Sequence, residues 1–121
     1  MNEKDSRGSV TVLAAGVLFL ACALSLVSVD LLRGLQAKAR AQTAADAAAL
    51  AAARELALPS SQSPTQAAQE YAQRNGATLI SCICAPGTSE AVVEVEVTAS
   101  LLFVGADRTV RGRARAVVGG P

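Results

Sequence analysis

The stretch AQTAADAAALAAA, residues 41–53, decides the fold because it consists mostly of alanine, the residue with the highest helix propensity. Its single charged side chain is the carboxylate of Asp46. It lies within residues 30–58, a run of strong helix formers that holds one glycine and no proline. We therefore predict one unbroken helix over this run. Leucines at three-and-four spacing on either side of the alanines give that helix an apolar stripe, which predicts that it covers a small domain.

An uncharged run, SVTVLAAGVLFLACALSLVSV at residues 9–29, precedes this helix. A helix rises ~1.5 Å per residue, so this length crosses a hydrocarbon core of ~30 Å. A short polar tail holding Lys4 and Arg7 stands before it, as in a signal sequence. We predict a cytoplasmic tail at 1–8, a transmembrane helix at 9–29, an exposed helical continuation at 30–58 and a small extracytoplasmic domain at 59–121.

Two processing sites compete with this uncleaved signal anchor. The tripeptide ACA at residues 21–23 fits a small-x-small cleavage site, and FLAC, ending at Cys22, loosely resembles a lipoprotein cleavage box. The alternative is therefore a lipoprotein or secreted binding module processed near Cys22. Because the apolar run continues to Val29, where a processed chain would already be polar, the sequence favours the anchor.

The remainder of the chain predicts one short helix and three strands. In SPTQAAQEYAQRNG, residues 63–76, Ser63, Pro64 and Gln66 form a helix start with a capping box, and Asn75-Gly76 forms the stop. From residue 77 the apolar period changes to two, in the segments ATLISCIC, AVVEVEVTASLLF and RTVRGRARAVV. The expected fold class is α+β, a three-stranded antiparallel meander with one short helix and with the long helix as its lid.

Each of the last two strands alternates apolar with charged residues. Glu94 and Glu96 face one side of the middle strand, and Arg111, Arg113 and Arg115 face the same side of the last strand. Cross-strand ion pairs at this spacing explain the arginines better than anion binding does, because no aromatic residues accompany them. We expect no nucleic-acid partner.

The composition argues against catalysis and metal binding. The chain has no histidine, and its net charge is only +1. Cys82 and Cys84 alone make half of a zinc site, so they predict either a local or intermolecular disulfide or two free thiols. We expect no enzyme activity, no cofactor, no metal and no small-molecule substrate.

The N-terminal part resembles a known family. A short basic tail with Gly8, an apolar span, Asp30 at its outer end and the helix LQAKARAQTAADAAALAAA are together similar to the N-terminal module of the TadE and TadG group of Tad/Flp pilus-assembly proteins. The resemblance covers roughly residues 7–55, and TAADAAALAAA is its most specific part. The small, strand-rich remainder resembles the short TadE-like proteins of actinobacterial secretion and pilus loci.

This resemblance implies a minor pilin-like or assembly component of a surface appendage or secretion machine. Its implied partners are the membrane, an inner-membrane platform and other pilin-like subunits. The positions that match the family pattern, and that we expect to mediate interaction, are Asp30, Ala45, Asp46, Ala49 and Leu50. Leu13 stands where a processed pilin has glutamate, so the sequence favours a component that is neither cut nor polymerised.

Overall fold

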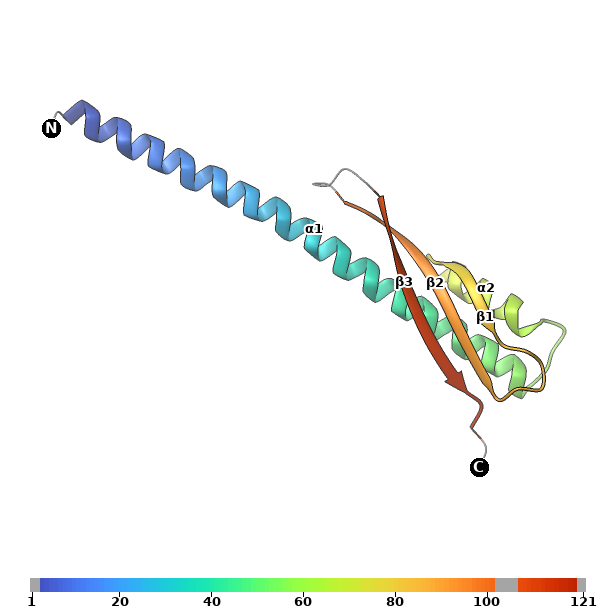
Figure 1. Ribbon diagram of the computed structural model, residues 1–121. Coiled ribbons are helices and arrows are strands. Elements are labelled where there is room, and N and C mark those ends of the chain that lie inside the picture. The colour runs from blue at the N-terminus through green and yellow to red at the C-terminus, as the bar shows by residue number, and fades with distance from the viewer. Residues whose placement is uncertain (1–2, 102–106, 120–121) are drawn as a thin grey trace.

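The computed structural model describes residues 3–101 and 107–119. Its elements are the helices α1 (Glu3–Ala57) and α2 (Pro64–Arg74) and the strands β1 (Thr78–Ile83), β2 (Glu90–Ser100) and β3 (Asp107–Val117). Figure 1 shows the N-terminal half of α1 projecting away from a small domain built on its C-terminal half. The predicted α+β arrangement is confirmed.

Helix α1 is continuous through the predicted span and the alanine stretch, as expected from their shared lack of proline. Helix α2 begins where the sequence predicts. The Ser63 side chain accepts a hydrogen bond from the Gln66 backbone N–H, and the Gln66 side chain accepts one from the Ser63 N–H. This capping box satisfies two N–H groups that the first helical turn would otherwise leave unpaired.

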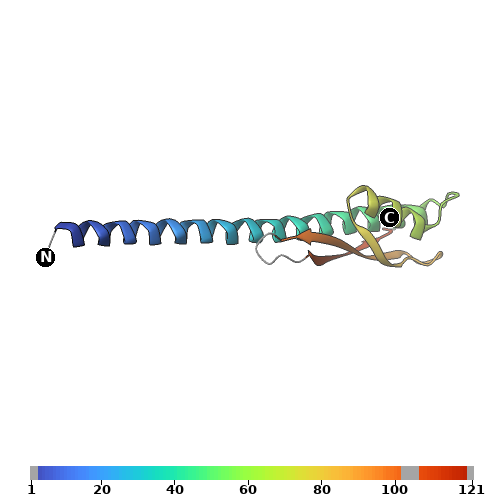
Figure 2. The ribbon, with the colours of Figure 1, turned by 90° about the horizontal axis from the view of Figure 1, so that it is seen from above.

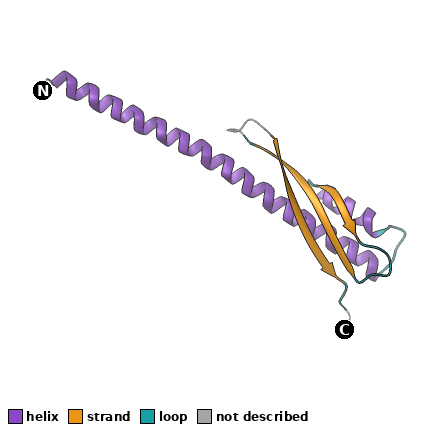
Figure 3. Cartoon of the chain, in the orientation of Figure 1, coloured by secondary structure: helices purple, strands orange, loops and turns teal. Residues whose placement is uncertain are grey.

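The three strands form one antiparallel sheet in the order β1-β2-β3 (Figure 3). The register between β2 and β3 runs unbroken from Glu90 opposite Val117 to Ser100 opposite Asp107. A bulge between Leu79 and Ser81 interrupts the pairing of β1 with β2, which the sequence did not predict. The middle strand ends at Ser100, and the further strand residues expected at 102 and 103, with most of the expected turn at 104–107, lie outside the described residues.

One face of the sheet is covered and the other is open. Along β2, alternate side chains are fully or nearly fully buried, and those between them are half-buried or exposed. The C-terminal half of α1 lies against β2 and β3, and α2 packs on α1 and β1 (Figure 2). The predicted lid is therefore present, and both helices share the inner face of the sheet.

The core is built mainly from alanine. Val93 and Val95 are the largest side chains that are fully buried, and the α1 side of the core consists of small residues at Ala37, Ala41, Ala44, Ala45, Ala48, Ala49, Ala51, Ala52 and Ala53. Small side chains let two backbones approach closely, so the helix and the sheet lie near one another. Gly112 marks this approach, because a Cβ there would lie 2.3 Å from the Ala41 carbonyl oxygen.

Candidate functional site

The apolar half of α1 lies outside the folded domain. Among the described residues, α1 alone is long and apolar enough to cross a membrane, and its apolar window is entirely unburied. A helix that is apolar on every side needs lipid or protein around it. This unburied apolar length is typical of the one spanning helix of a single-pass membrane protein.

The domain begins where this apolar segment ends. Asp30 is half-buried at the end of the segment. One turn later, the Arg33 guanidinium donates a hydrogen bond to the carbonyl oxygen of Ser100 (3.3 Å), the last residue of β2. This contact ties the end of β2 to α1 just beyond the predicted span.

The alanine stretch divides into a buried and an exposed side. Ala45 and Ala49 are 0% and 1% exposed, and both belong to the core under the sheet. Asp46 is exposed, and Leu50, one turn further, is 66% exposed. Of the four family-pattern positions in this stretch, Asp46 and Leu50 are therefore the ones open to solvent, whereas Ala45 and Ala49 build the domain itself.

Asp46 has a partner inside the chain. The amide Nε2 of Gln42 donates to Asp46 Oδ1 (3.2 Å) and to the backbone carbonyl oxygen of Arg113 (3.1 Å). The carboxylate thus orients an amide that binds strand β3. Sequence reasoning did not single out Gln42, although its spacing of four from Asp46 is the spacing at which glutamine and aspartate pair on a helix.

Leu50 stands between two open grooves. A groove of about 520 Å³ lies between α1 and α2, and its walls include Ala47, Arg54 and Tyr71. A second groove, of about 390 Å³, lies between α1 and β3, and its walls include Asp46 and Val117. Alanines make up half of the lining of the groove beside β3, whereas the groove beside α2 also holds Arg54, Glu55 and Glu70. Leu50 lines both grooves.

The outer face of the sheet carries cross-strand ion pairs, as expected, but the pairs are diagonal, and one of them uses Glu90 rather than the expected Glu96. Arg111 pairs with Glu94 (3.3 Å), and Arg115 pairs with Glu90 (2.5 Å). The residues directly opposite those arginines are Glu96 and Val92. Exposed pairs of this kind contribute at most about 1 kcal/mol each. The charged face of the sheet is therefore exposed to solvent, and its ion pairs add little to the stability of the domain.

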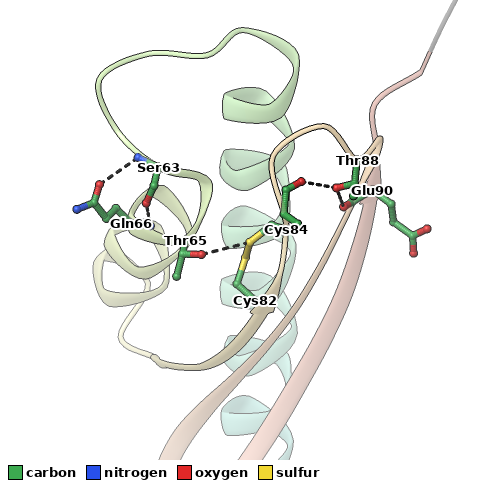
Figure 4. Close-up of a disulfide and its surroundings, with 8 residues drawn as sticks. Ser63, Thr65, Gln66, Cys82, Cys84, Thr88 and Glu90 are labelled. Carbon is green, nitrogen blue, oxygen red and sulfur yellow. Dashed lines mark hydrogen bonds between the residues drawn. A yellow bond between two sulfur atoms is a disulfide. The ribbon is translucent and has the colours of Figure 1, made fainter.

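The cysteine pair lies at the end of β1 (Figure 4). The sulfur atoms of Cys82 and Cys84 are joined as a disulfide, and the Thr65 hydroxyl on α2 lies 3.6 Å from the Cys84 sulfur. Cys22 is free and exposed in the apolar half of α1. No cluster of three or more metal-ligating side chains occurs in residues 3–101 or 107–119.

Comparison with known proteins gives one match. Residues 8–55 match the family described as putative Flp pilus-assembly TadE/G-like, which confirms the resemblance drawn from the sequence. The match covers nearly all of α1 and leaves α2 and the sheet outside it. No curated protein and no solved structure matches the chain. The match supports a Tad/Flp pilus-related role, and it points to a structural rather than a catalytic one.

Proposed function

From the premise that residues 8–55 are a TadE/G-like pilus-assembly segment, we propose that this protein is a membrane-anchored, minor pilin-like assembly component of a Tad/Flp-type pilus or secretion apparatus. Its N-terminus would lie in the cytoplasm and its α+β domain outside the membrane. The apparatus would contact it through the exposed residues Asp46 and Leu50.

The main support for this proposal is that one helix, α1, serves both as the apolar segment and as part of the core of the domain. The matched segment supplies the apolar half of α1 and also the alanines that close the core of the domain. A continuous helix of residues 30–57 is about 40 Å long at ~1.5 Å per residue. The domain is therefore held rigidly, with its contact surface at a fixed height above the bilayer.

Exposure supports the choice of Leu50. Leu50 is 66% exposed and lines both grooves, so a partner protein that covers it would remove apolar surface from water. The buried alanines beside it fix the backbone that presents it, because any shift of α1 would disturb the core.

The test is complementation of a strain that lacks the gene. Leu50→Asp places a charge on the proposed contact surface and should abolish assembly of the appendage or export through the machine, with the protein still present in the membrane. Ile83→Asp is the matched control, because Ile83 is 65% exposed on β1 and lies away from both grooves. Equal activity of both variants would refute the contact surface.

The same strains test the anchor. We expect the purified protein to keep residues 1–29, because the apolar run remains in the bilayer. An intact mass that corresponds to a chain beginning at Cys22 with acyl chains attached would refute the uncleaved anchor and show that the protein is a lipoprotein.

A further inference from the structure

The free edge of β3 is the feature that the proposed function leaves unused. In the sheet order β1-β2-β3, β3 has a neighbour on one side only, and it runs for 11 residues without proline. Helix α2 and β1 lie toward the other edge of the sheet (Figures 1 and 2). A long edge strand with open backbone groups is a template for pairing with another chain.

The direction of the backbone groups follows from one hydrogen bond and the register. The Val118 N–H donates to the Ser89 carbonyl oxygen (2.7 Å), so residue 118 points toward β2. Successive residues of an antiparallel strand alternate between hydrogen-bonded and non-bonded positions, and this register is unbroken. The N–H and C=O groups of Arg113, Arg115 and Val117 therefore point away from β2.

One of these outward groups is already occupied. The side-chain amide of Gln42 donates a hydrogen bond to the Arg113 carbonyl oxygen. Within residues 3–101 and 107–119, this is the only hydrogen bond recorded on the outward groups of Arg113, Arg115 and Val117. The edge is thus open from Arg115 to Val117, at the end of the domain that lies far from the membrane.

The 390 Å³ groove lies directly beside this open edge. Ala49, Leu50 and Ala53 line it from α1, and residues 114–117 line it from β3. Val117, at its end, is 59% exposed. A strand added to β3 lies ~4.8 Å from it, and its inward side chains would lie over the alanines and against Leu50. Only small or medium apolar side chains suit so shallow a groove.

The arginines of β3 determine which charged side chains an added strand can carry on the outer face of the sheet. Arg111 and Arg115 pair with acidic residues at the diagonal positions of β2, whereas the diagonal position for Arg113 is Val92. Glu94, which lies directly opposite Arg113, is the residue that pairs with Arg111. Arg113 is exposed and takes part in neither ion pair. A second copy pairing through its own β3 would bring arginines opposite arginines, which destabilises a sheet. A strand with acidic residues would place carboxylates beside the arginines of β3, as the glutamates of β2 do on the other side.

We propose that the edge of β3, which is open from Arg115 to Val117, binds an extended segment of a partner protein in which acidic residues alternate with small apolar ones, and that the groove bounded by Leu50 receives the apolar side chains. The segment adds a fourth strand to the sheet and sets its carboxylates beside Arg113 and Arg115. This inference rests on the proposed function, since it names the kind of partner that the surface around Leu50 receives.

The test uses two synthetic peptides and the full-length protein in lipid nanodiscs. One peptide alternates glutamate with valine, and the other alternates lysine with valine. We expect the glutamate peptide to bind and to protect the Arg115 and Val117 amides from hydrogen exchange, and the lysine peptide to bind at least about tenfold more weakly. Arg113→Gln should weaken binding of the glutamate peptide by about two- to fivefold, which is the range expected for the loss of one cross-strand charge pair.

Val117→Pro separates strand addition from simple charge attraction. Proline removes an N–H that points outward, so the pairing of β3 with β2 is kept while the edge loses a donor. We expect Val117→Pro to abolish binding of the glutamate peptide and Val117→Ala to preserve it. Equal binding of the two peptides, binding that survives Val117→Pro, or no binding at all would overturn the inference.

These outcomes are distinct from failure of the proposed function. If Leu50→Asp stops assembly but the glutamate peptide does not bind, the edge inference falls alone. If the peptide binds as expected but a strain without the gene still assembles its appendage, the proposed function falls alone.

Discussion

Replacement of Gly112 by alanine tests the close contact between α1 and β3. A Cβ at this position would lie 2.3 Å from the Ala41 carbonyl oxygen, 2.5 Å from the Ala41 carbonyl carbon and 2.9 Å from the Gln42 nitrogen. Nonbonded heavy atoms are most stable at about 3.5–4.0 Å, so each of these contacts is too short. All three atoms belong to the helix backbone, so no side-chain rotation relieves the overlap.

The cost follows from what has to move. The strand and the helix must separate by about 1 Å, and Val95, which lies opposite Gly112 and is fully buried, then loses part of its packing. An added carbon in a packed core commonly costs about 1–3 kcal/mol. Because the overlap here is with backbone, we expect Gly112→Ala to lower the free energy of unfolding by about 3 kcal/mol, the upper end of that range.

The assay is urea unfolding of the full-length protein in detergent, followed by far-ultraviolet circular dichroism. Gly34→Ala is the control, because a Cβ on Gly34 meets nothing within 4 Å and the residue lies inside α1. An alanine there should raise stability by about 0.5–1 kcal/mol. If Gly112→Ala changes stability by less than about 0.5 kcal/mol, the close crossing of α1 and β3 is refuted.

Three further predictions concern single contacts. Ser63→Ala removes the cap of α2 and should cost about 1 kcal/mol of stability in the same assay, whereas Ser63→Asp should restore most of it. Arg115→Gln breaks an exposed ion pair and should change stability by at most about 1 kcal/mol, with the effect fading at high salt; a larger, salt-independent loss would contradict a solvated ionic face. Non-reducing mass spectrometry should find Cys82 and Cys84 in one peptide that is lighter by two hydrogen atoms than after reduction, and alkylation of both thiols without reductant would contradict the disulfide.

Much of the fold could be predicted because its signals are local. Helix α1 follows from helix propensity and the absence of proline, and the start of α2 follows from the Ser63 capping box. The alternation of valine with glutamate gave the buried and open faces of β2. Each of these signals depends on residues a few positions apart, and none of them requires knowledge of how the elements pack.

The features that escaped prediction depend on packing between distant segments. An alanine-rich helix has no large apolar residue to mark its buried face, so the sequence did not separate the buried Ala45 and Ala49 from the exposed Asp46. The contact of Gln42 with the Arg113 carbonyl arises only where α1 crosses β3. Gly112, which interrupts the alternation of β3, is the local signal of that crossing, because only a residue without a Cβ fits against α1 there.

Site-specific photo-crosslinking in living cells from position 50 tests the central claim most directly, with position 83 as the equally exposed control. We predict that position 50 captures identified Tad/Flp pilus or secretion components, that position 83 does not, and that the captured protein keeps residues 1–29. Capture of no such component from position 50, or a captured chain that begins at Cys22, would contradict it.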